Sequence, residues 1–193
     1  VISAHRPAGA FASSRSPYLW TAESGRIARC TNLETGETVQ QLCGHMGPVS
    51  GVATLAIAPD RTLICTASWD RSIRIWPSTP GKPLCIALLE NAASDLLKAL
   101  HIDATNLLLY SGGNDKVVRA WDLSAVVSWA QSLSWDEWQA LSVRAPNEPC
   151  PKPDLVGVLQ GAHTRPIVCI STLPPAPQDA VAFGDLPPTG TLF

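Results

Sequence analysis

Three side chains of the kinds that form a hydrolytic triad occur at short spacing in the first half of the chain. His45 stands 21 residues before Thr66, and Asp70 follows four residues after that threonine. A histidine that is oriented by a carboxylate and faces a hydroxyl can activate that hydroxyl as a nucleophile. The chain has no Gly-x-Ser-x-Gly turn, which would support such an enzyme. Hydrolysis is therefore one interpretation of the trio, to be weighed against the wider pattern around it.

Cysteine and histidine, the usual zinc ligands, are present but scattered. Cys43 and His45 stand close together, but no Cys-x-x-Cys pair occurs, and a structural zinc site needs four ligands. We expect no metal and no other cofactor. Single cysteines within strands are typical of buried reduced thiols and favour an intracellular location, cytoplasmic or nuclear. The six cysteines are Cys30, Cys43, Cys65, Cys85, Cys150 and Cys169.

The charge balance limits the class of partner. The formal net charge is −2 and charged residues make up 16% of the chain, which predicts no polyanion partner. Arg74 and Arg119 occupy equivalent positions and join Arg61 and Arg71 as local positive charges, but no aromatic side chains alternate with them. Nucleic acid is therefore not the expected partner. No run approaches 18 apolar residues, so we expect no membrane span.

Two stretches of the chain are copies of one unit. Leu63–Trp76 aligns with Leu108–Trp121, and in each an aspartate stands six residues before the final tryptophan. The two aspartates are 45 residues apart, as are the two tryptophans. A fixed period of this size predicts a repeat architecture.

The residues that flank the copies carry a family resemblance. Gly44-His45 precedes the first copy, Trp121-Asp122 ends the second, and Gly161-Ala-His163 opens another unit. This combination resembles the WD-repeat family, whose four-stranded blades run from Gly-His to Trp-Asp. The resemblance is strongest over residues 42–123 and implies an all-β fold of WD40-type β-propeller blades, about four in number and some incomplete.

Alternation of apolar and polar residues, punctuated by turn residues, predicts the strands themselves. Four short strands per 40 to 45 residues are typical of a propeller. The predicted strands lie at 19–22, 26–30 and 38–43, at 48–58, 62–68, 72–76 and 82–89, and at 96–102, 106–112 and 117–121.

The resemblance divides the chain into four units. They are a degenerate or partial blade at 1–45, a blade at 46–90, a blade at 91–160 with a helical insertion within 124–153, and the truncated start of a further blade at 161–193. A closed ring of seven blades needs about 280 residues. We therefore expect a fragment of a longer WD-repeat protein, completed by the rest of the native chain or by another chain.

The same resemblance gives this trio a structural role. It implies a buried hydrogen-bonded network in each blade, which leaves no buried polar group unpaired. The complete set is His45, Thr66, Asp70 and Trp76, and the incomplete set is Ser111, Asp115 and Trp121. Glu90 occupies the aligned histidine position of the second set, and Pro77 replaces the aspartate that usually follows Trp76. We therefore expect no catalytic residue and no enzyme.

One unit is longer than the period allows, and the excess reads as a helix. His45 and His163 are 118 residues apart, against about 90 for two blades. Ser134 and Glu137 form a capping-box pattern, and Leu133 with Trp138 fits a hydrophobic staple. These features predict a short helical insertion at about 124–145.

The candidates for partner binding are four tryptophans and Asn114, and two interpretations stay open for the tryptophans. Trp129, Trp135 and Trp138 either pack the insertion onto the propeller or form a partner-binding knob. The resemblance places Trp69 and Asn114 near the rim of the propeller face. Trp69 is either an exposed aromatic anchor or a stacking contact with the neighbouring blade.

The functional expectation is a non-catalytic scaffold that mediates protein–protein interactions in a multiprotein assembly. Its short loops would be displayed rigidly on a stable ring. This expectation combines the resemblance with the lack of any catalytic group outside the repeat. The alternatives are a nucleic-acid-associated propeller and, less favoured, an enzyme housed in a propeller.

Overall fold

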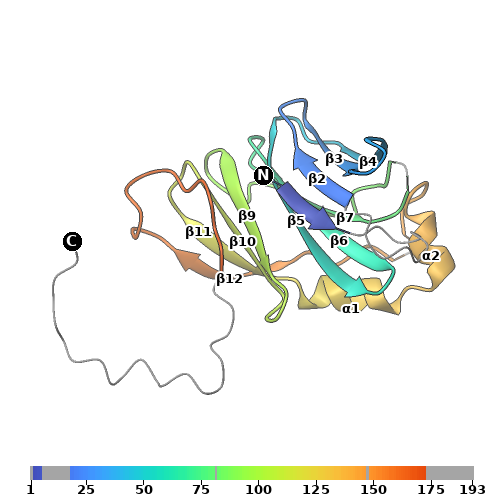
Figure 1. Ribbon diagram of the computed structural model, residues 1–193. Helices are drawn as coiled ribbons and strands as arrows, with labels where there is room; N and C mark the ends of the chain where they lie inside the picture. Colours follow the sequence, from blue (N-terminus) through green and yellow to red (C-terminus); the bar gives the residue numbers. More distant parts are fainter. Residues whose placement is uncertain (1, 6–17, 81, 147, 173–193) are drawn as a thin grey trace, which may run out of the picture.

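The fold consists of three four-stranded antiparallel sheets and two short helices (Figure 1). The computed structural model describes residues 2–5, 18–80, 82–146 and 148–172, and for residues 2–5 it describes only the strand placement. Within these residues each strand pairs with its neighbour in the chain, so that every sheet is a meander. This arrangement confirms the all-β class predicted from the sequence.

The strands of the three sheets follow one another along the chain. The first sheet contains β1 (Ile2–His5), β2 (Tyr18–Ala22), β3 (Ile27–Asn32) and β4 (Thr38–Cys43). The second contains β5 (Val49–Ala58), β6 (Arg61–Ser68), β7 (Ile73–Pro77) and β8 (Ala87–Leu89). The third contains β9 (Leu97–Asp103), β10 (Leu108–Gly113), β11 (Val118–Asp122) and β12 (Asp154–Leu159).

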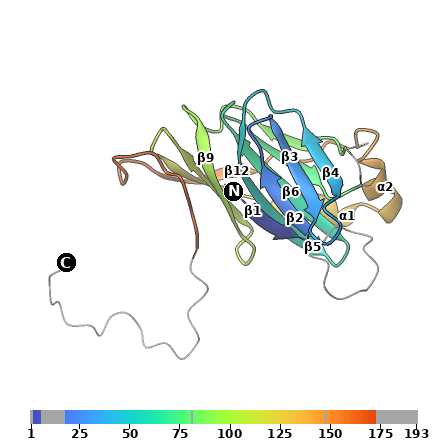
Figure 2. The ribbon, with the colours of Figure 1, turned by 45° about the horizontal axis from the view of Figure 1, so that its top comes forward.

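The sheets pack face against face in chain order, with the second in the middle (Figures 1 and 2). Trp20 and Leu42 of the first sheet share a core with Ile64 and Trp76 of the second. The opposite face of the second sheet packs on the third, as its buried residues share a larger core with Trp121. The second sheet therefore buries one face against the first sheet and the other against the third.

The turn between the second and third strand has the same backbone in all three sheets. Arg26, Arg71 and Lys116 have φ angles of 67°, 68° and 63°. They are spaced 45 residues apart, which is the sequence period. The left-handed residue tightens each hairpin at a steric cost of roughly 1 kcal/mol for a residue other than glycine. The repeat is thus a repeat of backbone geometry as well as of residue type.

Two helices occupy the connection from β11 to β12. They are α1 (Ser124–Ser132) and α2 (Trp135–Ala140), which confirms the predicted insertion. Ser134 caps α2 by accepting a hydrogen bond from the backbone of Glu137, whose carboxylate accepts one from the backbone of Ser134. The predicted capping box is therefore present, and it separates α2 from α1.

Three details differ from the sequence-based prediction. β1 was not predicted, since residues 6–17 separate it from β2 without a hairpin turn signal. β8 begins only at Ala87 rather than at Lys82, because Pro83 has no N–H to give to a ladder. Residues 160–172 contain no strand, although Ile167 N–H donates to the carbonyl of Gly113 at 2.9 Å. The predicted further blade extends into 173–193, outside the described residues.

Candidate protein-interaction surface

The end of the second sheet that carries the β6–β7 turn is organised by a buried hydrogen-bonded network. His45, which lies between β4 and β5, places Nδ1 2.9 Å from Asp70 Oδ2 and Nε2 2.8 Å from Thr66 Oγ1. Trp76 Nε1 donates to the same hydroxyl at 2.9 Å. The four residues therefore form one chain of contacts from Trp76 to Asp70.

The direction of each bond follows from its partners. Asp70 can only accept, so His45 carries its proton on Nδ1 and accepts from the Thr66 hydroxyl at Nε2. Burial lowers the pKa of His45 and outweighs the opposing influence of Asp70, so the ring is neutral at physiological pH. Burial opposes the ionisation of Asp70, but bonds from Ser72, Met46 N and His45 hold its pKa well below its ordinary value.

The geometry of this network leaves no route for catalysis at Thr66. The Thr66 side chain is fully buried, and its oxygen already accepts from Trp76. His45 is only 5% exposed. A nucleophile must reach the atom that it attacks, and no substrate can approach this hydroxyl without opening the sheet. The trio therefore acts as a structural connection between the loop of His45 and the β6–β7 turn.

Ser72 is a fifth member of the network that the sequence pattern did not single out. Its hydroxyl donates to Asp70 Oδ1 at 2.6 Å, and its oxygen lies 3.2 Å from His45 Nδ1. Its backbone N–H also donates to Asp70 Oδ1 at 2.9 Å. A serine two residues after the aspartate closes the turn, but a serine in a turn is too common to be recognised from sequence alone.

The third sheet satisfies its aspartate in a different way. Trp121 Nε1 donates to Ser111 Oγ at 2.9 Å, as Trp76 does to Thr66. Asp115 Oδ2 accepts from Arg119 Nη1 at 2.7 Å, and Ser94 N donates to it at 3.2 Å. Burial opposes the ionisation of Asp115, but the bond from Arg119 contributes to a lowered pKa. Arg119 therefore pairs with Asp115 in the third sheet, as His45 pairs with Asp70 in the second.

The structural counterpart of His45 in the third sheet is Ala93, which corrects the predicted alignment with Glu90. The backbone N–H of Met46, directly after His45, donates to Asp70, and that of Ser94, directly after Ala93, donates to Asp115. Glu90 is exposed. Ser94 stands 21 residues before Asp115, whereas Met46 stands 24 residues before Asp70, so the loop before β9 lies three residues later than a strict 45-residue period would place it. Alignment by period alone could not detect this shift.

Two large apolar side chains stand exposed above the network. Trp69 is 44% exposed at the β6–β7 turn, and Met46 is 73% exposed on the adjoining loop. Trp69 N–H donates to Pro48 O at 3.0 Å, which ties the two loops together. Gly47 lies between them, and a Cβ at this position would be 2.9 Å from the backbone nitrogen of Asp70. The loops are therefore closely packed while their two apolar tips face outward.

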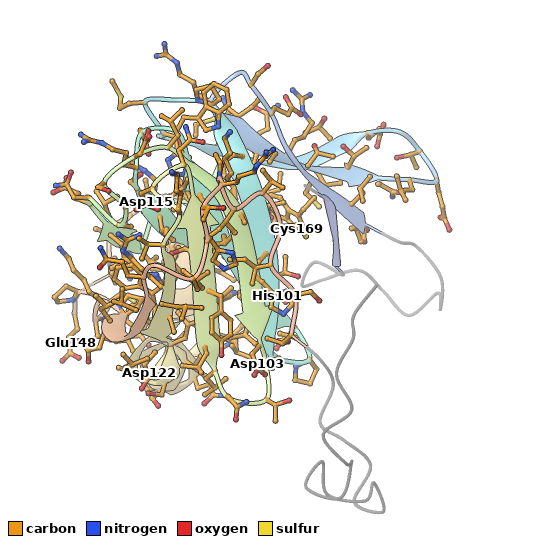
Figure 3. The ribbon with its side chains drawn as sticks, turned by 90° about the vertical axis from the view of Figure 1, so that its left-hand side faces the viewer. His101, Asp103, Asp115, Asp122, Glu148 and Cys169 are labelled. Carbon is orange, nitrogen blue, oxygen red and sulfur yellow. The ribbon has the colours of Figure 1, made fainter. Side chains whose placement is uncertain are left out.

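Asn114, the counterpart of Trp69 in the third sheet, is less accessible to a partner. Asn114 N–H donates to Leu96 O at 2.9 Å, which reproduces the bond between Trp69 and Pro48. Its side chain is half-buried, and its Oδ1 is a buried acceptor with no partner among the described residues. Figure 3 shows Asp115, at this turn, at the opposite end of the third sheet from Asp103. Asn114 is therefore placed at the rim but presents little surface.

The tryptophans of the insertion have three different environments. Trp138 is fully buried, and its ring lies under the guanidinium of Arg61 at 5.5 Å. It is therefore unavailable to a partner, which corrects its inclusion among the candidate contacts. Trp135 is 43% exposed, and Trp129 is half-buried against the core. The sequence pattern gave all three tryptophans the same two interpretations and could not separate them.

Two further sequence-based expectations concern metals and membranes. Among the described residues, no group of three or more His, Cys, Asp and Glu side chains is close enough to hold a metal ion. None of the helices in the same residues has the length and apolar character needed to cross a membrane.

The chain resembles known WD-repeat proteins. Residues 36–77 match the family described as WD domain, G-beta repeat. The Polycomb group protein FIE1 of Zea mays is 32% identical over 124 residues, which cover 62% of this chain and 26% of that protein. The ribosome biogenesis protein WDR12 homolog of Nematostella vectensis is 32% identical over 104 residues, or 48% of this chain and 23% of that protein.

A solved structure shows the fold. A chain in a humanized mutant of the Chaetomium thermophilum Polycomb Repressive Complex 2 superimposes with a TM-score of 0.58 at 18% identity, covering 88% of this chain and 34% of that one. The matches to the two sequence relatives span about a quarter of their lengths. The family match confirms a WD repeat at residues 36–77, and the solved structure confirms the propeller-type fold predicted from the sequence.

Proposed function

We propose that this WD-repeat chain is a non-catalytic scaffold that binds other proteins within a multiprotein assembly, and that Trp69 anchors one partner. The carrying observation is an exposed indole on a turn that its neighbours hold in place. Relatives named as a Polycomb group protein and a ribosome biogenesis protein support a role in large assemblies. The ring itself would be completed by further blades of the native chain or of another chain.

The rigidity of the turn is what makes Trp69 a good anchor. Its backbone is bonded to Pro48, and the next residue, Asp70, is bonded to His45 and Ser72. A partner that buries this indole therefore does not have to order the loop, so little conformational entropy is lost on binding. Tryptophan is also the residue type most enriched at binding hot spots.

The absence of catalysis is part of the same proposal. The three groups that could have formed a triad are hydrogen-bonded to one another in the buried network, and the hydroxyl of Thr66 is fully buried. Two of the four arginines that favoured nucleic acid are also engaged: Arg119 pairs with Asp115, and Arg61 donates to helix carbonyls. These contacts support protein binding over the two alternatives.

An intracellular, cytoplasmic or nuclear, location fits the thiols. Burial raises the pKa of Cys30, Cys65 and Cys150 to about 12, so these thiols stay protonated and unreactive at neutral pH. All six cysteines are free. A chain with several free thiols is suited to a reducing compartment.

The test compares two exposed tryptophans that differ in position. Tagged chains carrying Trp69→Ala or Trp135→Ala are expressed in the native cell type, and the proteins that co-purify are quantified by mass spectrometry. We expect Trp69→Ala to weaken the recovered interaction about 30-fold, which corresponds to ~2 kcal/mol. Trp135→Ala tests the other exposed candidate, whose side chain has nearly the same exposure, and a loss confined to it would place the anchor on the helical insertion instead.

Both variants must first show unchanged circular dichroism and thermal unfolding. Equal recovery of the same proteins by Trp69→Ala and by the unaltered chain would remove Trp69 as an anchor. Recovery of nucleic acid with strong salt dependence would instead support the nucleic-acid alternative.

A further inference from the structure

Each of the three sheets carries one exposed basic side chain at the same turn. Arg26, Arg71 and Lys116 lie in the turns between the second and third strands and are spaced 45 residues apart. All three are exposed, and none takes part in an ion pair between described residues. We call these three residues the basic arc. The buried network of His45 and Asp70 uses none of their charges, so the arc is available to a ligand.

The backbone at these positions is unfavourable for a long side chain. The φ angles of the arc residues are 67°, 68° and 63°, in the left-handed region that glycine and asparagine adopt most readily. Each sheet nevertheless places an arginine or a lysine there. Residues held in such conformations gather at functional sites, and the repeated strain therefore indicates a function for the positive charge.

The first and second turns are connected through the loop that precedes β5. Val49 N–H donates to Glu23 O, beside the first turn, at 3.1 Å. Trp69 N–H, in the second turn, donates to Pro48 O at 3.0 Å. Because Pro48 and Val49 are consecutive, one short stretch of backbone holds both turns at the same rim.

The loop before β9 connects the second and third turns in the same way. Ala92 N–H donates to Arg71 O at 2.9 Å, and Ser94 N–H donates to Asp115 Oδ2 at 3.2 Å. Sheets that pack face to face lie ~10 Å apart, and an extended chain advances roughly 3.3 Å per residue. Successive members of the basic arc are therefore about three residues of an extended peptide apart.

Acidic side chains gather at the opposite end of the sheets. Neighbouring strands are antiparallel, so the β3–β4, β5–β6 and β9–β10 turns lie at the end away from the arc. Figure 3 shows Asp103 and Asp122 at that end, away from Asp115. The acidic residues of these turns and the adjoining strand ends are Glu34, Glu37, Asp60, Asp103, Asp122 and Asp154. They outnumber the basic residues of that end, so an acidic partner is repelled there and attracted to the arc.

The carboxylates beside the arc favour a peptide over a nucleic acid. Asp70 and Asp115 are paired with side chains of their own sheets or loops. Glu90 and Asp95, on the loop between the second and third turns, are exposed and take part in no ion pair between described residues. They would repel a nucleic acid, whose phosphates recur along the whole strand. A peptide can place neutral residues opposite them.

We infer that the basic arc binds an acidic segment of a partner protein that lies across the three turns, with aspartate or glutamate at about every third residue and an apolar side chain between them. The apolar side chain would pack on Trp69, which stands two residues before Arg71 and is 44% exposed. Met46, 73% exposed on the adjoining loop, would widen this contact. The inference rests on the proposed function, because it names the chemistry of the partner that Trp69 anchors.

Selection from a peptide library tests the inference without a known partner. Phage that display random peptides of about twelve residues are selected on the immobilised full chain at low salt, and the enriched peptides are synthesised and titrated. We expect aspartate or glutamate about three residues apart around an apolar residue. The affinity should fall about tenfold when Arg26→Asn, Arg71→Asn and Lys116→Asn are combined, because each exposed ion pair contributes modestly.

A matched variant separates the arc from an effect of net charge. Asparagine removes the charge and tolerates the left-handed conformation, so the circular dichroism and thermal unfolding of the arc variant should be unchanged. The control combines Lys82→Gln, Arg144→Gln and Lys152→Gln, which remove three exposed basic side chains outside the turns of the arc. It should bind the peptides as tightly as the unaltered chain, and an equal loss in both triple variants would overturn the inference.

Trp69→Ala separates the arc from the tryptophan anchor. Loss of binding in the arc variant but not in Trp69→Ala would support the acidic segment and remove Trp69 as an anchor. Loss in Trp69→Ala but not in the arc variant would leave the proposed function standing and overturn the inference. The inference also fails if no acidic peptide is enriched. It fails equally if single-stranded DNA of about twelve nucleotides binds more tightly than the best peptide and loses its affinity in the arc variant.

Discussion

At the residue scale, the chain stabilises the turn between the second and third strands in two different ways. Asp70 is bonded to a neutral histidine from the preceding loop, and Asp115 to an arginine on the following strand. Arg74 occupies the position of Arg119 in the second sheet, but its Nε is buried without a partner among the described residues, because Asp70 is taken by His45. The choice between histidine and arginine therefore depends on which residue the preceding loop supplies.

The histidine version makes stability sensitive to acid. The ordinary pKa of histidine is 6.5, and burial lowers that of His45 in the folded state. Between the two values the unfolded chain binds more protons than the folded one, so the free energy of unfolding falls as the pH drops below about 6.5. Asp70 adds to this only below its ordinary pKa of 3.8, since its folded-state pKa is lowered too.

Urea denaturation measured between about pH 7 and about pH 5 checks this prediction. The unaltered chain should lose stability steadily, and His45→Gln should be less stable at neutral pH but show a flatter dependence on pH. His163→Gln changes an exposed histidine and serves as the control. Parallel pH profiles for His45→Gln and the unaltered chain would show that His45 does not carry the acid sensitivity.

At the scale of elements, the insertion joins two sheets that would otherwise meet only through their faces. The helices leave from β11 of the third sheet, yet Gln131 donates to Ile57 O at 3.0 Å and Arg61 donates to both Ala130 and Leu133, across to the second sheet. Figure 1 shows α1 below the ends of β5 and β6. The insertion therefore acts as a clamp between neighbouring blades.

Arg61 is the residue on which this clamp depends most. Its guanidinium makes two hydrogen bonds to carbonyls near the end of α1 and lies over the ring of Trp138. Replacing it with alanine should lower the free energy of unfolding by ~2 kcal/mol, because two acceptors and a cation–π contact lose their partner. Chemical denaturation followed by tryptophan fluorescence measures the loss. Arg165→Ala, at an exposed arginine, is expected to have little effect, and an equal loss in both variants would argue against a clamp.

Features that recur with the period or join residues close in sequence could be predicted from the sequence. Contacts between residues far apart in the chain could not. The turns and strands recur with a 45-residue period, so the β6–β7 and β10–β11 turns were predictable from residues such as Asp70 and Asp115. The capping box of Ser134 was predictable because it is local. The contact between Arg61 and Leu133 joins residues 72 positions apart and follows no period. Trp138 is fully buried and its ring lies under the same guanidinium, which is again a contact between residues distant in sequence that the helical pattern alone could not reveal.

At the scale of the whole molecule, each outer sheet is covered by another sheet on one face only, whereas the middle sheet is covered on both faces. The Trp20 face of the first sheet and the Trp121 face of the third are buried against the second. β12 is the outermost strand of the third sheet, and its apolar residues remain about half exposed: Leu155, Val156, Val158 and Leu159 are 49%, 56%, 53% and 52% exposed. A further blade packed on this sheet would cover those of these residues that point away from the second sheet, since successive side chains of a strand alternate between its two faces.

An apolar strand at the edge of a sheet predicts self-association of the chain when it is studied alone. An uncovered strand pairs readily with another chain, and a lysine placed on it opposes that pairing. We expect light scattering to report an average mass above 20.5 kDa that rises with concentration. Val158→Lys should lower this mass, whereas Val143→Lys, at a site 81% exposed but outside the sheets, should not. A folded monomer at every concentration would mean that the face of β12 needs no partner, and the case for an incomplete ring would lose its main physical support.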